Sequence, residues 1–336
     1  MSTPRILSIV SPALYDRLFE PDVREMLHGI GEVTLQEDDS PWTSERLAGV
    51  IGGYDALLTC WGAPKLTPEV LEAATRLKIV AHSAGTVKFF IGEDVLARGI
   101  RVTSASAAMA PAVAEFALIF TMLGLRPVHE YNEVMHNQPD RWEANGARGF
   151  GPEIASSRIG VVGAGLVGRQ YIAKVKALGA EVVVADPYLP DEDAVAMGVE
   201  RVDLPDLMAS CPIVAIHAPS TPETHHMIGR AELAAMPDGG FLINTARSWV
   251  VDQEALLAEL QSGRLRAALD VYDQEPLPAD HPFRSLPNVI LTPHVAGASA
   301  QTNRRQGLFA VEDLRRFFAG EPLAHEVTLE RYRVLA

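Results

Sequence analysis

Cysteine is scarce in this chain: Cys60 and Cys211 are the only two among 336 residues. Two cysteines cannot form a disulfide framework, and their spacing is not that of a CxxC metal or redox motif. The opening segment, Met1–Pro12, holds one basic residue and an apolar run over Ile6–Val10 that is too short for a signal peptide. These absences predict a cytoplasmic protein in a reducing compartment.

Long apolar runs and basic residues are also in short supply. The strongest apolar stretch, Phe116–Leu125, covers about half a membrane span, so no membrane partner is expected. Lys and Arg number 29 against 43 Asp and Glu, which gives a formal net charge of −14. A field of that sign repels phosphate backbones, so nucleic acid is not an expected partner. An anionic substrate would need a local group of donors.

The chain does have the composition of a globular protein and a length of about two domains. Its first hundred residues alternate strands with helical stretches, which is typical of a parallel sheet with crossover helices. Helices are predicted over Thr67–Leu77, after a capping threonine, and over Ile91–Arg98, before Gly99. The predicted strands are Ile6–Val10, Val33–Leu35, Ala56–Thr59, Ile79–Ala81 and Arg101–Thr103.

An apolar helix is predicted next, over Pro111–Leu125. A helix that is apolar all round must be buried, either between domains or against a second subunit. The polar stretch His129–Gly151 follows, and its glycines indicate a loop that links two parts of the chain; they are Gly146, Gly149 and Gly151.

Six further strands alternate with helices in the second half, a pattern typical of a Rossmann-type sheet. They are Ile159–Val162, Glu181–Ala185, Ile213–His217, Gly240–Asn244, Ala267–Val271 and Val289–Leu291. The last predicted helix, Asn303–Ala319, ends at Gly320 and is expected to pack back onto the first domain.

The sequence Gly163-Ala164-Gly165-Leu166-Val167-Gly168 fits GxGxxG between a predicted strand and the predicted helix Leu166–Leu178. In that context Gly163 permits a tight turn, Gly165 lets the backbone approach a pyrophosphate, and Gly168 lets helix and strand pack closely. The N–H groups of Leu166 and Val167 would face the phosphates. An ordinary glycine-rich turn is the alternative for the pattern taken alone.

An acid at the end of the second strand favours the dinucleotide interpretation. Asp186 lies where a carboxylate is expected to bind the ribose 2′-hydroxyl, and Pro187 and Tyr188 follow it. With no arginine or lysine there to meet a 2′-phosphate, the motif predicts NAD in preference to NADP.

Three polar residues follow later strands, at the sheet edge where open α/β sheets bind ligands. They are Arg247, Glu275 and His294. Singly they could be a surface cation, a loop acid and a structural histidine. Together they form a set for carbonyl reduction: a cation, a proton donor and a carboxylate that orients the donor.

These motifs, taken in order, resemble those of the D-isomer specific 2-hydroxyacid dehydrogenases. The resemblance runs from about Leu77 to Gly320 and implies an enzyme that transfers a hydride between NAD(H) and a small 2-hydroxy or 2-keto acid. The segments that carry it are Gly99–Thr103, Val113–Glu115, Gly163–Gly168, Asn244–Arg247, Leu269–Val271, Glu275–Leu277 and Thr292–Gly297.

The family resemblance implies two Rossmann-like domains, with parallel sheets, helices on both faces and a cleft between them. Residues 1–108 and 302–336 would form a discontinuous substrate domain, and residues 109–301 the NAD-binding domain. A homodimer is expected.

The resemblance also implies roles for single residues. Arg247 would grip the substrate carboxylate and carbonyl, His294 would be the acid and base, and Glu275 would pair with His294. The backbone of Ala84, Gly85 and Thr86 would bind the substrate carboxylate. Asp270 would face the nicotinamide amide, and the cofactor would also be lined by Thr245, Ala246 and Pro219.

The chain departs from the family pattern at three places. Ser248 stands where a glycine usually follows the arginine, and Ser156-Ser157-Arg158 replaces a glycine-containing turn. The first 75 residues match weakly, and they are expected to shape the substrate pocket. The identity of the 2-hydroxy acid and the physiological direction therefore stay open, as do the roles of Trp61, His82 and Trp142.

Two alternatives complete the sequence-based interpretation. An NAD-sensing, corepressor-like binding protein on the same fold is the rival to the enzyme. A metal at His225-His226 is not expected, because adjacent histidines rarely converge without a third ligand.

Overall fold

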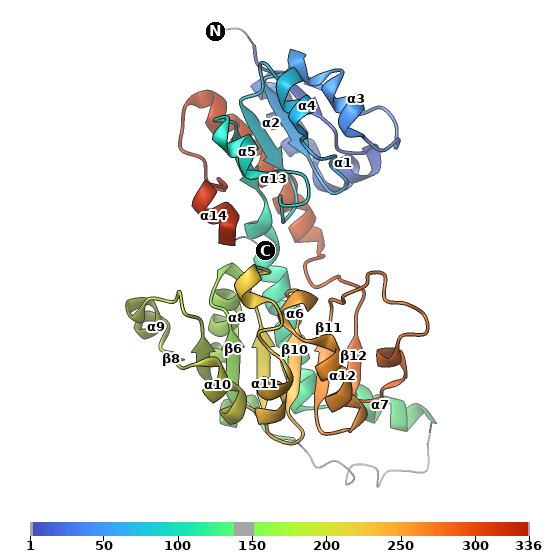
Figure 1. The fold of residues 1–336 in the computed structure, drawn as a ribbon, viewed down its shortest axis with the longest axis vertical. Coiled ribbons are helices and arrows are strands. Elements are labelled where there is room, and N and C mark those ends of the chain that lie inside the picture. The colour runs from blue at the N-terminus through green and yellow to red at the C-terminus, as the bar shows by residue number, and fades with distance from the viewer. Residues whose placement is uncertain (1–2, 138–150, 335–336) are drawn as a thin grey trace. The chain divides into compact units, whose positions relative to one another are not determined.

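The computed structural model describes residues 3–137 and 151–334, and the chain divides into two compact units (Figure 1). Unit 1 comprises residues 1–109 and 298–336, and unit 2 comprises residues 110–297. Each contains one parallel sheet flanked by helices, which confirms the predicted α/β class with two Rossmann-like sheets.

Unit 1 contains five parallel strands in the order β2-β1-β3-β4-β5. The strands are β1 (Arg5–Ser8), β2 (Glu32–Thr34), β3 (Ala56–Thr59), β4 (Ile79–His82) and β5 (Arg101–Ser104). The helices are α1 (Pro12–Leu18), α2 (Pro21–Ile30), α3 (Ser44–Ala48), α4 (Pro68–Ala73), α5 (Glu93–Ala97), α13 (Ala300–Ala319) and α14 (Leu329–Val334).

Both faces of the unit 1 sheet are covered at the central strands β1, β3 and β4, whose residues are almost all buried. One cluster joins the sheet to α1, α2 and α13, and the other joins it to α3, α4 and α5. The predicted last helix is confirmed: α13 contacts α1, α2 and β4, and ends at Gly320 in the left-handed conformation. Thr67 is the N-cap residue of α4, as predicted, but its side chain makes no capping hydrogen bond.

Unit 2 contains seven parallel strands in the order β12-β11-β10-β9-β6-β7-β8. The strands are β6 (Arg158–Val162), β7 (Glu181–Ala185), β8 (Glu200–Arg201), β9 (Ile213–Ile216), β10 (Phe241–Asn244), β11 (Arg266–Leu269) and β12 (Val289–Leu291). The helices are α7 (Val128–Asn137), α8 (Leu166–Ala177), α9 (Asp191–Met197), α10 (Leu204–Ser210), α11 (Arg230–Ala235) and α12 (Gln253–Gln261), preceded by α6 (Ser106–Leu125), which begins in unit 1.

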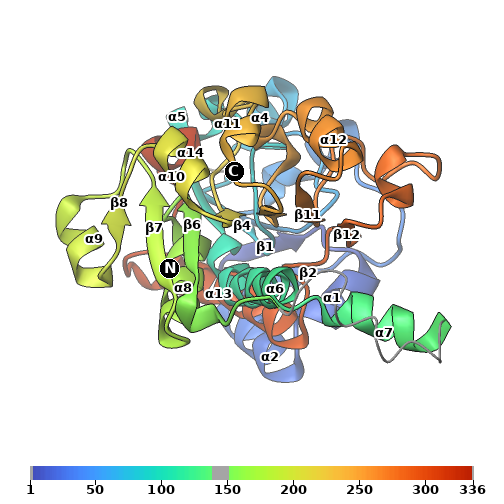
Figure 2. The same ribbon diagram turned by 90° about the horizontal axis from the view of Figure 1, so that it is seen from below.

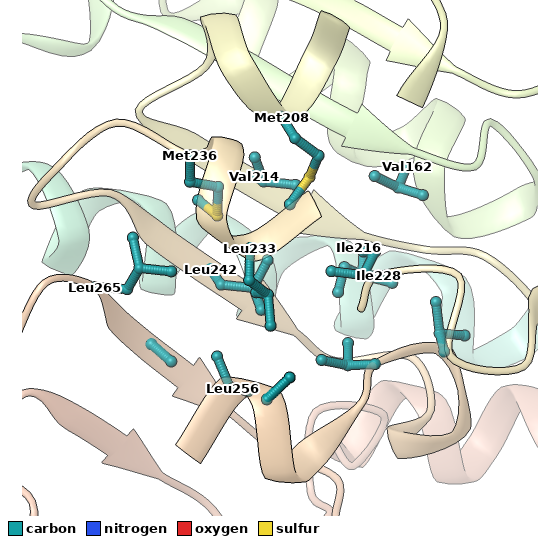
Figure 3. Packing of buried hydrophobic residues seen from close by; sticks show 14 of the residues in the cluster. Val162, Met208, Val214, Ile216, Ile228, Leu233, Met236, Leu242, Leu256 and Leu265 are labelled. Atoms are coloured by element: carbon teal, nitrogen blue, oxygen red, sulfur yellow. The ribbon is translucent and has the colours of Figure 1, made fainter. Parts of the chain in front are cut away.

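Successive residues of each central strand in unit 2 pack into opposite hydrophobic clusters. In β10, Leu242 joins the cluster beneath α10, α11 and α12, whereas Phe241 and Ile243 join the cluster on the side of α6 and α8. Figure 3 shows the first cluster, in which Met208, Leu233 and Leu256 cover Leu242. This two-faced burial fixes the register of the strands and so the position of the loops that follow them.

The structure corrects three predictions in unit 2. Strand β8 was not predicted, because it has two residues, both polar and exposed, at the sheet edge beside α9 (Figure 2). Residues 128–137 form α7, although they were predicted to begin a loop; Glu130 in its first turn suits the helix dipole. Helix α6 begins at Ser106, five residues before the predicted start, and accommodates Pro111. The predicted loop residues Gly146 and Gly149 lie outside the described residues, as does Trp142.

Helix α6 is the one helix of the described residues that is long and apolar enough to cross a membrane. Length and composition alone are weak grounds, because the core helix of a soluble protein passes the same test. Four of its residues, Ala114, Ala117, Phe120 and Leu125, are buried in a cluster of unit 2.

Candidate active site

The loops after β11 and β12 bring two of the predicted site residues together. The Nδ1 atom of His294 lies 2.6 Å from Oε2 of Glu275. The other carboxylate oxygen of Glu275 accepts the main-chain N–H of Tyr272 at 3.0 Å. The imidazole side chain is 48% exposed, so Nε2, which has no hydrogen-bond partner among the described residues, is open to a ligand. A histidine held by a carboxylate in this way can give or take a proton at Nε2.

The backbone of His294 has an unusual conformation, with φ of 53°. This left-handed region is uncommon for residues other than glycine and needs support from its surroundings. Asp270, which is 1% exposed, provides that support. Its Oδ1 atom accepts the hydroxyl of Thr292 at 2.5 Å and the N–H of Val295 at 2.9 Å, and its Oδ2 atom accepts the N–H of Ala296 at 2.8 Å. The carboxylate therefore fixes the turn that carries the imidazole.

Arg247 projects from a turn after β10 that Asn244 stabilises. The Asn244 side chain accepts the N–H of Ala246 at 3.0 Å and donates to the carbonyl of Arg247 at 2.9 Å. Burial lowers the pKa of Arg247, and the negative charge of Glu275 acts against this. The guanidinium therefore interacts electrostatically with Glu275, so the structure brings all three predicted polar residues into one site of unit 2.

The glycine-rich turn joins β6 to α8 at the same edge of the sheet. Gly163 has φ of 92°, and a Cβ atom there would lie 2.8 Å from the nitrogen of Ala218. A Cβ at Gly168 would lie 2.1 Å from the carbonyl oxygen of Gly163. Gly165, the N-cap residue of α8, provides no side-chain cap, and a Cβ there would meet no other atom within 4 Å. The first N–H groups of α8, at Leu166 and Val167, are not capped by a side chain, which suits a pyrophosphate.

Asp186 follows β7, and its carboxylate hydrogen-bonds to this glycine-rich turn. One carboxylate oxygen accepts the N–H of Ala164 at 2.7 Å and the other accepts the N–H of Tyr188 at 2.8 Å. Arg169, which no sequence motif indicated, donates to the carbonyl of Ala164 and pairs with Asp193. The positive charge of Arg169 is therefore already paired with Asp193.

Two buried polar side chains near these turns have no hydrogen-bond partner within the part of the chain that the structure describes. They are Thr245, at its hydroxyl, and His217, at both ring nitrogens. Burial lowers the pKa of His217 to about 3, so its imidazole is neutral. Buried polar groups are rarely left unpaired in a native protein. These groups, with the uncapped end of α8, therefore fit a polar ligand such as a dinucleotide. Pro219 and Ala246 lie in the same two loops.

In unit 1, the predicted substrate loop follows β4. Ala84 and Gly85 are buried and Thr86 is partly buried, and the hydroxyl of Ser104 donates to the carbonyl of Gly85. The N–H groups of these three loop residues have no hydrogen-bond partner among the described residues, which leaves them available to an anion.

The residues left open by sequence analysis have local roles in unit 1. His82 shares a 2.9 Å hydrogen bond with the hydroxyl of Thr59, and burial lowers its pKa to about 3. It is a neutral histidine packed against Phe90. Trp61 is 48% exposed, and the guanidinium of Arg17 lies 5.5 Å from the centre of its ring system.

The adjacent histidines stack on an indole. The rings of His225 and His226 are 4.0 Å apart, and His225 is 4.0 Å from Trp249. Over residues 3–137 and 151–334, no group of three or more His, Cys, Asp or Glu side chains is arranged to hold a metal ion.

Comparison with known proteins identifies the family. Residues 117–296 match the model of the NAD binding domain of D-isomer specific 2-hydroxyacid dehydrogenases. The chain belongs to this family. The match covers the glycine-rich turn and the loops that carry Arg247, Glu275 and His294, so these loops lie in the NAD binding domain of this family.

Relatives named as enzymes cover most of this chain. It is 33% identical to the D-3-phosphoglycerate dehydrogenase of Methanocaldococcus jannaschii over 89% of its own length, and spans 56% of that relative. It is 33% identical to the glyoxylate reductase of Korarchaeum cryptofilum over 86% of its length and 87% of the relative. The D-mandelate dehydrogenase structure of Rhodotorula graminis is 26% identical, with a TM-score of 0.84, and covers 97% of this chain and 98% of its own.

Proposed function

We propose that this protein reduces a small 2-keto acid with NADH, and that His294 is the acid and base of the reaction. The observation that carries the proposal is the hydrogen bond between His294 Nδ1 and Glu275, beside the charge of Arg247. The carboxylate orients the imidazole through Nδ1, and Nε2 is left to face a substrate oxygen. Bound NADH supplies the hydride.

Residues of this chain would transfer the proton, stabilise the developing charge and bind the substrate carboxylate. Protonated His294 donates a proton to the carbonyl oxygen of the substrate, and Arg247 stabilises the negative charge that develops on that oxygen. The free N–H groups of Ala84, Gly85 and Thr86 bind the substrate carboxylate. In the reverse reaction the neutral imidazole takes the proton from the hydroxyl group.

A panel of substrates tests this proposal. Purified protein should oxidise NADH in the presence of one or more of glyoxylate, hydroxypyruvate, pyruvate and bulkier 2-keto acids. The first three test a small pocket, and a preference for the bulkier acids would move the substrate class toward that of an enzyme such as D-mandelate dehydrogenase. NADH binding without turnover on the whole panel would contradict the proposal and favour an NAD-sensing role.

We also propose that Asp186 selects NAD over NADP. Its carboxylate is fixed next to the glycine-rich turn by two main-chain N–H groups, and its charge would repel a 2′-phosphate. Fluorescence titration should show tighter binding of NADH than of NADPH, and Asp186→Ala should narrow the difference. Asp191→Ala is a matched control, because Asp191 pairs with Arg201 on β8 instead. Equal affinities of the wild type for both cofactors would remove Asp186 from this role.

A homodimer through α6 and the segment after it is a further part of the proposal. Four large apolar side chains on α6 and α7 are at least 39% exposed: Ile119, Met122, Val128 and Met135. Burial of such side chains against a second copy would remove apolar surface from water. Sedimentation should show a dimer, and Ile119→Glu should weaken it. A species of only 36.4 kDa at micromolar concentration would count against the dimer.

We also propose that the protein is located in the cytoplasm. The two cysteines, Cys60 and Cys211, are free and buried, which suits a reducing compartment. Cell fractionation that recovered the protein outside the cytoplasm would contradict it.

A further inference from the structure

We propose that Tyr272 is a positioning residue that holds both members of the His294–Glu275 pair in place. The inference rests on the proposed function, because it assumes that this pair transfers the proton. Tyr272 lies in the loop after β11, three residues before Glu275, and is buried. Its side chain reaches the end of the neighbouring strand β12.

The phenol joins the ends of two adjacent strands. Its hydroxyl lies 2.9 Å from the carbonyl oxygen of Leu269, where β11 ends, and 2.8 Å from that of Thr292, just after β12. Burial raises the pKa of Tyr272 to about 12, so the group stays protonated and donates at any working pH. The two carbonyl oxygens share this one proton.

The Thr292 carbonyl connects the phenol to His294. The same oxygen accepts the main-chain N–H of His294 at 3.1 Å, inside the turn where His294 has its left-handed backbone. Glu275 is held from the other side, because the N–H of Tyr272 donates to its Oε1 atom at 3.0 Å and leaves Oε2 for His294. Tyr272 therefore holds Glu275 directly through its main-chain N–H, and holds His294 indirectly through the Thr292 carbonyl.

The hydroxyl should matter because the His294 backbone does not favour its conformation. Asp270 holds the hydroxyl of Thr292 and the main-chain N–H groups of Val295 and Ala296. The Tyr272 phenol is the side chain that holds the Thr292 carbonyl. Without the hydroxyl, the Thr292 carbonyl can rotate and the imidazole loses its fixed direction. Small displacements of a proton donor reduce turnover more than substrate binding.

Tyr272→Phe removes this hydroxyl and changes neither charge nor ring size. With the best substrate of the panel, kcat should fall by about threefold to tenfold while KM and the NADH dissociation constant stay within about twofold. In a His294→Ala background the same substitution should have no further effect on kcat, because the residue acts through His294. An equal loss in both backgrounds, or no loss in the wild type, would overturn the proposal.

Tyr171→Phe is the matched control in the same unit. It also removes a buried hydroxyl with a partner, the side chain of Thr121 at 2.6 Å. This control should lower the thermal midpoint and leave kcat unchanged. If Tyr171→Phe reduced kcat as much as Tyr272→Phe, the effect would be one of general stability and the positioning role would be excluded.

A proton spectrum of the free enzyme provides a readout without turnover. The proton between His294 Nδ1 and Glu275 should give a downfield signal that His294→Ala abolishes, and Tyr272→Phe should move it upfield as the hydrogen bond lengthens. An unmoved signal would contradict the proposal. The proposed function fails separately, if His294→Ala itself keeps full turnover.

Discussion

In each unit a histidine hydrogen-bonds to a carboxylate through Nδ1, and the pairs His325–Asp313 and His294–Glu275 differ in burial. In unit 1, His325 lies 3.0 Å from Asp313, whose side chain is 1% exposed. Asp313 also accepts the main-chain N–H groups of Ala324 and His325. In unit 2, the side chains of His294 and Glu275 are 48% and 36% exposed, and one imidazole nitrogen faces outward.

The difference in burial suits the His325–Asp313 pair to a structural role and the His294–Glu275 pair to the proposed proton transfer. The Asp313 carboxylate is saturated by donors of one short segment, so its pair ties residues 324–325 to α13. Glu275 is held by one N–H group and uses its second oxygen on the imidazole alone. A histidine can exchange protons with a substrate only where its second nitrogen is reachable.

The largest effect expected from this comparison is on turnover. His294→Ala removes the proton donor and should lower kcat by about 10² to 10⁴, with NADH affinity near that of the wild type. Steady-state kinetics and NADH titration measure both. His325→Ala, the matching change in unit 1, should keep kcat; if the two variants lost turnover equally, the distinction between the pairs would be wrong.

Glu275→Gln should come next, because it keeps the shape of the side chain and removes its charge. Partners that orient a reactive group are worth about 10-fold to 100-fold in activity, so kcat should fall by that factor with little change in thermal midpoint. Asp313→Asn, its counterpart in unit 1, should lower the thermal midpoint and leave kcat near that of the wild type. A Glu275→Gln enzyme with full kcat would show that the charge is not needed.

For Asp313→Asn we expect a loss of stability of about 1 to 3 kcal/mol, because an amide nitrogen cannot accept the N–H groups that the carboxylate holds. Urea denaturation followed by circular dichroism measures it. Unchanged stability would mean that the segment around His325 is held by other contacts, such as the stacking of His325 on Phe309.

The smallest expected effect is on the stability of the protein at acid pH. Burial by itself would raise the pKa of Asp55, but the N–H of Arg5 and the side chains of Arg76 and Lys78 together lower it. A carboxylate whose pKa is lowered by folding stabilises the protein above its unfolded pKa of about 4, and the contribution is lost as pH falls further. Between about pH 5 and pH 3, the wild type should therefore lose stability more steeply than Asp55→Asn. Parallel curves would exclude this linkage.

The strands and the candidate site residues could be predicted from sequence because both have local signals. Apolar runs between turn residues place every described strand except β8 to within about two residues, and Arg247, Glu275 and His294 each follow such a run. Strand β8 is short and polar and has no apolar period, so it was missed. Helix α7 has apolar residues at helical spacing, but the polar character and glycines of the stretch that contains it favoured a loop.

The supports of the site could not be predicted in the same way. Asp270, Tyr272 and Thr292 act through main-chain groups of a different strand, and no pattern in the sequence says which N–H or carbonyl they will reach. Asn244 is the exception, since an asparagine that bonds to the backbone two or three residues later is a recognisable turn signal.

The discontinuity of unit 1 determines the order in which a ribosome can complete the two sheets. All seven strands of unit 2 and their covering helices lie within residues 106–291, and they are synthesised before α13. Unit 1 still lacks α13, which covers one face of its sheet, and the segment around Val327, whose N–H bonds to Val102 on edge strand β5. Strands β1 to β5 therefore have one apolar face covered only by α1 and α2, and one edge unpaired, until residues 300–327 have been made.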